Sequence, residues 1–179
     1  MEPKGIIPAI RHLKVFEKAL NSSHEWIVLL ETRLGHVKSL VRHARQANKK
    51  VLIHIDLIQG LKPDEYGIEY LANEIKPDGI ISTRGSVVEL TKKHKLIAVQ
   101  RLFLLDSLSL ENYVNLNERY KPDYMEVLPG IVPDIIREIH QQTNIPIIAG
   151  GLIKKQSEVE EALAAGAIAV STSCTDLWK

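Results

Sequence analysis

The chain has 179 residues, of which 45% are hydrophobic and 25% charged, and its formal net charge is +1. This length supports one domain with a good core, which we place at residues 1–179, and the charge excludes a global attraction to nucleic acid or membrane. Cys174 is the only cysteine and no apolar run could span a membrane, so no internal disulfide is possible and a reducing, cytoplasmic location is expected.

Short apolar runs alternate with amphipathic segments along the whole chain. Trp26–Leu30 is apolar without interruption, which is typical of a parallel strand covered on both faces, and Leu34–Ala47 has apolar residues at helical spacing. The predicted strands are Gly5–Ile10, Trp26–Leu30, Lys50–Ile55, Gly79–Ser82, Leu96–Leu105, Tyr124–Leu128, Ile145–Ala149 and Ala167–Val170. The predicted helices are Leu13–Leu20, Leu34–Ala47, Glu65–Ile75, Ser86–His94, Leu108–Tyr120, Val132–Thr143 and Ser157–Ala165.

This regular alternation predicts right-handed parallel units that close into a compact (β/α)8 barrel of the TIM type. The chain is short for that fold, which usually takes about 250 residues. The last helix is truncated, because only Asp176–Lys179 follow Thr175, and the barrel surface left uncovered there suggests a contact between copies in a homo-oligomer. An open doubly wound sheet fits less well, since no G-x-G-x-x-G turn follows the first strand.

The segment Ile145–Cys174 predicts an anion site at the ends of the last two strands. Backbone N–H groups and hydroxyls at adjacent strand ends suit a phosphate, and the loops after strands seven and eight often bind one in this fold. Two arginines at other strand ends can add charge-assisted hydrogen bonds. The expected phosphate ligands are Gly150, Gly151, Thr172, Ser173, Arg84 and Arg101.

Polar side chains follow the other strands too, at the end of the barrel where function is concentrated in this fold. Their repetition favours a pocket for a small polar anion over simple exposure to solvent. No His-x-His pair or zinc-ligand cluster occurs there, so we predict neither a metal site nor a catalytic residue. The expected contacts to ligand hydroxyls are Glu31, His54, Asp56 and Glu126.

The stretch from Thr32 to Ile55 is basic and contains no acidic residue. Lys38, Arg42 and Arg45 within it lie on one helical face, away from the apolar side. A face built only for solubility would mix charges of both signs, whereas a row of cations suits a nucleic-acid backbone. The predicted nucleic-acid-binding residues are Arg33, Lys38, Arg42, Arg45, Lys49 and Lys50.

Several runs resemble the bacterial glycerol-3-phosphate-responsive antiterminator family, which governs the glycerol uptake operon. His54–Gly60 (HIDLIQG) and Gln100–Ser107 (QRLFLLDS) are specific, and the similarity extends from Ile7 to Ser173. The resemblance implies a barrel that binds glycerol 3-phosphate and, when loaded, acts on leader mRNA so that transcription passes a terminator. The remaining similar runs are Ile81–Arg84, Glu126–Gly130 and Ala149–Ile153.

We therefore expect a ligand-sensing, RNA-binding regulator of glycerol metabolism that is not an enzyme and needs no cofactor beyond its effector. Its expected partners are glycerol 3-phosphate, the leader mRNA of a glycerol operon and a second copy of the chain, and no membrane. Two alternatives stay open. One is a small phosphosugar enzyme, an isomerase or phosphoesterase, with Glu126 or Asp56 as base; the other is a ligand-binding barrel whose partner is a protein.

Overall fold

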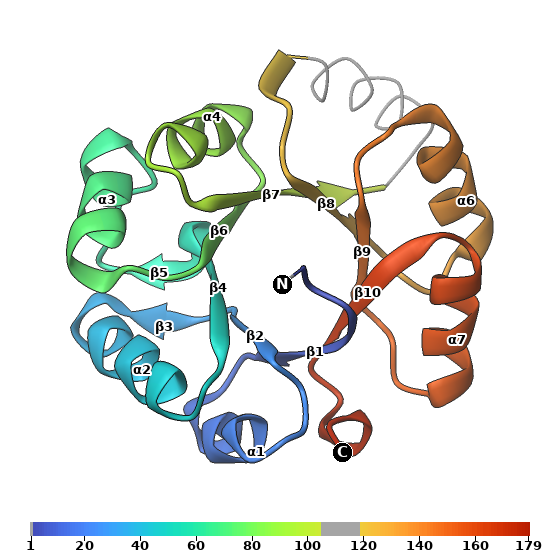
Figure 1. The fold of residues 1–179 in the computed structure, drawn as a ribbon, viewed down its shortest axis with the longest axis horizontal. Coiled ribbons are helices and arrows are strands. Elements are labelled where there is room, and N and C mark those ends of the chain that lie inside the picture. The colour runs from blue at the N-terminus through green and yellow to red at the C-terminus, as the bar shows by residue number, and fades with distance from the viewer. Residues whose placement is uncertain (1, 105–118) are drawn as a thin grey trace.

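The computed structural model describes residues 2–104 and 119–179, which form a closed barrel of eight parallel strands surrounded by helices (Figure 1). The strand order is β1-β10-β9-β8-β7-β6-β4-β2, so the first and last strands of the chain pair with each other. The predicted (β/α)8 barrel is confirmed. Its strands are β1 (Gly5–Ile10), β2 (Trp26–Leu29), β4 (Lys50–His54), β6 (Gly79–Ser82), β7 (Ile97–Phe103), β8 (Tyr124–Leu128), β9 (Ile147–Gly150) and β10 (Ala167–Thr172).

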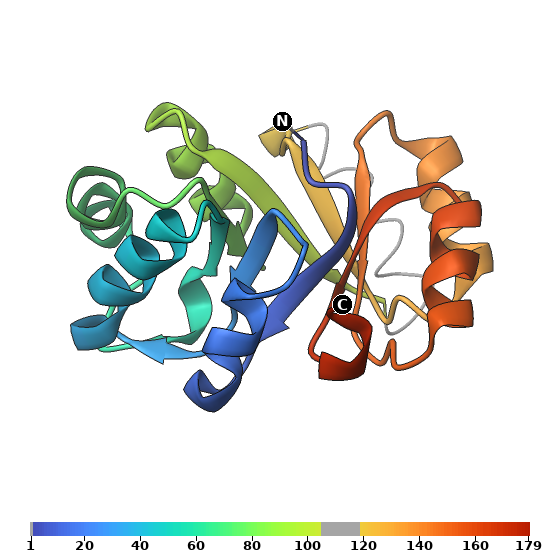
Figure 2. The ribbon, with the colours of Figure 1, turned by 60° about the horizontal axis from the view of Figure 1, so that its bottom comes forward.

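Helices pack around the outside, and α6 and α7 lie side by side on one flank of the barrel (Figure 2). A π-helical turn, Leu71–Ile75, continues α3. The predicted helix Leu108–Tyr120 lies outside the described residues except at its last two positions, which are helical. The helices are α1 (Phe16–Leu20), α2 (Leu34–Gln46), α3 (Glu65–Tyr70), α4 (Gly85–Lys93), α6 (Pro133–Gln142) and α7 (Gln156–Ala164).

Two short strands outside the barrel were not predicted. β3 (Thr32–Arg33) and β5 (Ile58–Gln59) pair in parallel as a separate two-stranded sheet. Their pairing joins the segments that follow β2 and β4. It therefore ties together two connections at the carboxyl end of the barrel.

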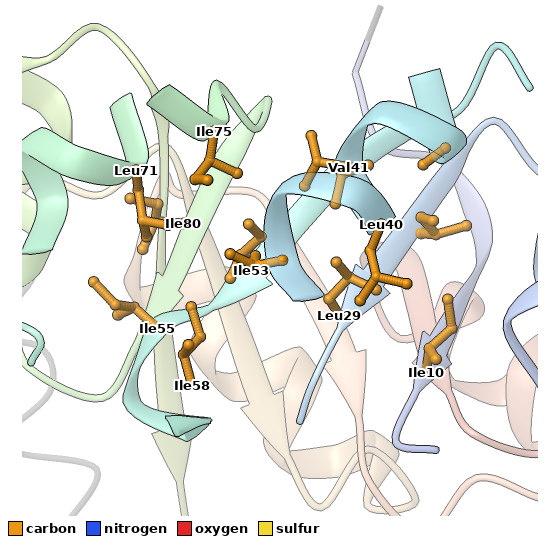
Figure 3. Close-up of a cluster of buried hydrophobic side chains, with 14 of the residues drawn as sticks. Ile10, Leu29, Leu40, Val41, Ile53, Ile55, Ile58, Leu71, Ile75 and Ile80 are labelled. Carbon is orange, nitrogen blue, oxygen red and sulfur yellow. The ribbon is translucent and has the colours of Figure 1, made fainter. Parts of the chain in front are cut away.

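Strand residues alternate between the barrel interior and the helical layer, as the period of two requires. On β4, Leu52 belongs to the cluster inside the barrel, whereas Ile53 packs against α2 and α3 in the outer cluster. Figure 3 shows this outer cluster between the strands and helices, with Leu40 of α2 beside Leu29 of β2. A second outer cluster joins β7–β10 to α6 and α7. The strands whose carboxyl ends are predicted to bind the ligand are thus fixed by apolar packing on both faces.

The truncated end of the chain covers the barrel instead of exposing it. After β10 the chain makes only a 3-10 turn, Thr175–Leu177, but Trp178 is buried among the outer cluster residues. Its indole Nε1 donates a hydrogen bond to the Thr172 carbonyl at 3.0 Å. The expectation of exposed apolar surface at this position was therefore wrong, because one large aromatic side chain replaces the missing helix.

Candidate functional site: a polar pocket at the carboxyl end of the barrel

A cavity of about 690 Å³ opens at the carboxyl ends of the strands. It lies over the ends of β1, β2, β7, β8, β9 and β10, while its lining includes no residue of β4 or β6. Apolar walls come from Leu30, Phe103 and Leu128, which share the interior face of their strands with residues of the inner cluster. The polar lining side chains are Arg11, Arg101, Glu126, Lys154, Ser171, Thr172, Ser173 and Cys174.

A buried ion pair forms the polar floor of this pocket. Arg101 and Glu126 are direct partners in the β7–β8 ladder, and the Arg101 Nε donates to Glu126 Oε2 at 2.6 Å. The side chains of this pair are only 8% and 2% exposed. Ser171 donates its hydroxyl proton to the other carboxylate oxygen, also at 2.6 Å. Charge-assisted hydrogen bonds of this length hold the guanidinium plane in one orientation.

The two terminal nitrogens of Arg101 enter no hydrogen bond within residues 2–104 and 119–179. The residue lines the cavity, so these donors are available on the pocket side. A planar fork of guanidinium donors matches the oxygens of a phosphate or carboxylate. This floor can therefore bind an anion.

Two adjacent glycines let the β9 end approach this floor closely. A Cβ on Gly150 would lie 2.7 Å from the Ser171 hydroxyl and 3.0 Å from Glu126 Oε1, so any larger residue would disturb both side chains. Gly151 and the following Leu152 both have positive φ, 78° and 64°. A backbone turn of this kind can present successive N–H groups to an anion.

Thr172 ends β10, the strand that pairs with β9, and Ser173 follows it. The Thr172 hydroxyl donates to the Ile153 carbonyl at 2.7 Å and accepts from the Cys174 N–H at 3.0 Å. It thus braces the β10 end against the loop that contains Gly151. Ser173 is exposed and lines the cavity.

A second polar cluster surrounds Asp56, outside the cavity lining. β4 ends at His54, and Asp56 lies in the following 3-10 turn, where the period of two no longer decides which way a side chain points. Its carboxylate accepts from the Ser82 hydroxyl and the Thr83 N–H, each at 2.9 Å. The Arg84 Nε lies 3.7 Å away. This cluster ties the β4 end to the β6–α4 loop.

His54 lies on the interior face of β4 and is 3% exposed. Its Nδ1 has no hydrogen-bond partner in the described part of the chain and lies 3.9 Å from Asp56 Oδ2. Burial, followed by repulsion from Arg101, lowers the pKa of His54 from 6.5 to about 4. The imidazole is therefore neutral near pH 7.

The structure divides the predicted ligand contacts into two groups. Gly150 lies directly behind the pocket floor, and Glu31 forms an ion pair with the lining residue Arg11 at 3.4 Å. Arg84, His54 and Asp56 lie outside the lining, in or beside the Asp56 cluster. The predicted contacts that line the cavity are Gly151, Thr172, Ser173, Arg101 and Glu126.

Sequence reasoning left out several lining residues. Ser171 could have been found, because it lies two positions before Ser173 on the same strand face. Lys154 gave no comparable signal, since it reaches the pocket from a loop. The apolar walls look like ordinary strand residues in the sequence.

The predicted RNA-binding cations are free of acids in the sequence but not in space. Lys38 pairs with Glu74 at 3.1 Å. Lys50 pairs with Glu25 at 3.2 Å. Lys49 donates to two backbone carbonyls at 2.6 Å, and burial lowers its pKa. The remaining members, Arg33, Arg42 and Arg45, are exposed.

Within the described residues, no group of three or more His, Cys, Asp or Glu side chains could hold a metal ion. No helix of this part of the chain is long and apolar enough to cross a membrane.

Comparison with known proteins agrees with the geometry of the fold. The chain is 46% identical to the glycerol uptake operon antiterminator regulatory protein of Listeria monocytogenes, with a TM-score of 0.96 over 99% of this chain and 96% of that one. A glycerol uptake operon antiterminator-related protein of Thermotoga maritima is 30% identical, with a TM-score of 0.88 over 99% of both chains. YgcP of Escherichia coli is 30% identical over 97% of this chain and 91% of its own.

Barrel enzymes are more distant. Deoxyribose phosphate aldolase from Aeropyrum pernix is 15% identical over 97% of this chain and 87% of its own, with a TM-score of 0.74, so it shows the fold alone. The Listeria protein is named as a regulatory protein and the Thermotoga protein as related to an antiterminator. With the family match, the protein is accordingly a regulator and not an enzyme. The sequence profile of the glycerol-3-phosphate responsive antiterminator family matches residues 6–178, and the chain belongs to that family.

Proposed function

We propose that the protein senses glycerol 3-phosphate and, when loaded with it, promotes antitermination by binding the leader mRNA of a glycerol uptake operon. The family description names the effector, and the name of the Listeria protein supplies the operon. The proposal needs an effector and no cofactor. Since leader mRNA is transcribed in the cytoplasm, the protein acts there.

One observation carries the effector assignment: Arg101 is held at the pocket floor by Glu126 and Ser171 with its terminal nitrogens on the cavity side. The phosphate binds these nitrogens together with backbone N–H groups near Gly151 and Ser173. Lys154 adds a second cation at the pocket edge.

The glycerol part of the effector lies beside the phosphate on the same floor, where Glu126 can accept from a hydroxyl. The other hydroxyl contacts expected from the sequence lie outside the lining and have no part in this proposal.

A thermal-shift titration tests the effector. Glycerol 3-phosphate at about 100 times its Kd adds about 2.7 kcal/mol to the free energy of unfolding, which raises the melting temperature by about 5–10 °C for a chain of this size. Glycerol, at the same concentration, is expected to cause no shift, and inorganic phosphate a smaller one. Absence of any shift with glycerol 3-phosphate would overturn the assignment.

A pair of variants locates the effector. Replacing the buried pair together, Arg101→Met with Glu126→Leu, removes the anion donors without leaving one charge unpaired, and the shift is expected to vanish. The matched control is Arg84→Gln, which removes an exposed arginine outside the cavity. An unchanged shift in the double variant would place the effector elsewhere.

For the RNA, we propose a surface that includes the exposed cations of the α2 region, Arg33, Lys38, Arg42 and Arg45. Lys49 and Lys50 contribute less, because both are engaged with neighbouring segments. Charge contacts to a phosphate backbone weaken steeply with salt.

A further inference from the structure

Four of the turns that lead from helix to strand on the amino-terminal rim of the barrel share an unusual backbone feature. Asn48, Lys76, Lys95 and Lys121 all have positive φ, between 46° and 60°. Each follows or ends a helix and precedes a barrel strand. Glycine and asparagine adopt this conformation readily, whereas a side chain such as lysine does so at a free-energy cost. At these four positions the chain uses asparagine once and lysine three times, whereas the turn between α7 and β10 uses Gly166.

The three lysines lie on consecutive turns of the rim. They precede β6, β7 and β8, which are neighbours in the barrel and stand about 4.8 Å apart, as strands in a sheet do. Backbone hydrogen bonds join the turns, from Ile97 N to Asp78 O at 3.1 Å and from Asp123 N to Ala98 O at 2.9 Å. The three lysines therefore form one continuous row, which we call the rim lysines.

Local structure does not account for this choice of residue. Pro77 and Pro122 disfavour a right-handed conformation at the residue before them, but Asn or Gly would satisfy that restriction with less strain. A cation near a helix C-terminus interacts well with the helix dipole, yet α4 already has Lys92 and Lys93 in its last turn.

Within residues 2–104 and 119–179, no acidic side chain forms an ion pair with the rim lysines. Asp78 and Asp123 lie two residues after Lys76 and Lys121, but their carboxylates accept from the strand N–H groups of Val51 and Ala98, both at 2.8 Å. None of the three ammonium groups enters an ion pair or hydrogen bond with any residue that the structure describes. All three residues are exposed.

Two further cations strengthen the row. Arg45, from α2, donates to the Lys76 carbonyl at 2.5 Å. Lys92, from α4, donates to the Lys121 carbonyl. Each side chain therefore reaches from its own helix to the next turn, where it fixes the backbone of a rim lysine. Arg45 adds positive charge there, whereas Lys92 is partly neutralised by Asp123, 3.7 Å away.

The partner suited to this surface is a polyanion. Protein interfaces have an apolar or aromatic core, but the exposed large apolar side chains of the described part lie near or beyond the carboxyl ends of the strands, at the opposite end of the barrel. We propose that RNA lies across the amino-terminal rim, with its phosphates on Lys76, Lys95 and Lys121. This inference rests on the proposed function and extends the α2 surface through Arg45.

The test replaces all three rim lysines with asparagine, the residue that the chain itself uses at the equivalent position 48. Asn tolerates the left-handed conformation, so the variant is expected to fold and to keep the glycerol 3-phosphate melting shift. A triple Lys→Arg variant preserves the charge and serves as the matched control. The Lys38→Gln, Arg42→Gln variant probes the α2 face separately.

Binding is measured by fluorescence anisotropy with a labelled transcript of the glycerol operon leader, in the presence of glycerol 3-phosphate and over a range of salt concentrations. The Asn variant is expected to bind the transcript at least about 10-fold more weakly. The slope of log K against log salt concentration should become about 2 less steep, since three phosphate contacts are removed. Binding by the Arg variant should match the wild type. An Asn variant within twofold of the wild type, with the same slope, would overturn the rim assignment alone, whereas a wild-type protein that binds no transcript would overturn the proposed function as well.

Discussion

Besides the exposed pair Arg11–Glu31, two arginine–carboxylate pairs lie at the carboxyl end of this barrel, and these two differ in almost every physical respect. Arg101 and Glu126 are 2.6 Å apart and nearly inaccessible to solvent. Arg84 and Asp56 are 3.7 Å apart, and the arginine is 60% exposed. The first pair forms the floor of a cavity, whereas the second ties loops together. The same two kinds of side chain thus do different work at neighbouring strand ends.

Strand register explains the difference. Arg101 and Glu126 occupy paired positions on β7 and β8, so their side chains point into the barrel at the same height. Asp56 and Arg84 follow the ends of β4 and β6, where the backbone has already turned away. Asp56 therefore satisfies hydrogen-bond donors of the next connection. Three variants test this comparison, in order of decreasing expected effect.

The largest effect is expected from Glu126→Gln. This change leaves the Arg101 charge buried without its partner, and breaking a buried pair in this way costs about 3–5 kcal/mol. Urea unfolding near pH 7 measures the loss. The double variant Arg101→Met, Glu126→Leu should recover most of the stability, because it removes both charges. A loss below about 1 kcal/mol for Glu126→Gln would contradict the view that the pair is desolvated.

His54 links the two pairs, because both Arg101 and Asp56 act on its charge. Its pKa is about 4 in the folded protein and near 6.5 when unfolded, so only the unfolded chain gains a proton as the pH falls through this window. Stability is unaffected by this group above pH 6.5 and decreases from there toward pH 4. Between pH 7 and pH 5 the loss is about 2 kcal/mol.

Replacing His54 with Gln should flatten this part of the stability–pH curve. Urea unfolding of wild type and variant at pH 7, 6 and 5 gives the difference in slope. The exposed His43→Gln variant is the control, and its curve should follow the wild type. Equal slopes for wild type and His54→Gln would show that the imidazole reaches solvent in the folded protein.

The sequence predicted the barrel well because its signal is local and repeated. A largely apolar run such as Tyr124–Leu128, which contains only Glu126 as a charged residue, is bounded by Lys121-Pro122-Asp123 and Pro129-Gly130, and the strand has those bounds. The pocket was only partly predictable. Which residues line the cavity depends on where β4 ends, at His54, and on the register between β7 and β8. The spacing of residues along the chain predicts neither of these two features.

The cationic surfaces show the same limit. Lys38 has no acidic neighbour in the sequence, but the fold brings Glu74 to within 3.1 Å of it. Lys76, Lys95 and Lys121 are far apart in the chain, and only the barrel places them on consecutive turns. The charge and hydropathy of the sequence do not predict their left-handed backbone conformation. A search for runs of cationic residues therefore could not find these three lysines.

The smallest effect is expected from Asp56→Ala in the second pair. The change removes the hydrogen-bond acceptor of the buried Ser82 hydroxyl and of the exposed Thr83 N–H. Water can replace the carboxylate at the Thr83 N–H but not at the Ser82 hydroxyl, so the free energy of unfolding is expected to fall by about 1 kcal/mol. Arg84→Gln, which removes an exposed partner, should cost less than about 0.5 kcal/mol. Both variants should bind glycerol 3-phosphate with wild-type affinity, as measured by calorimetric titration, because neither residue lines the cavity. A tenfold loss of affinity in Asp56→Ala, with stability preserved, would instead show that both pairs belong to one ligand site. The pocket would then extend across the ends of β4 and β6.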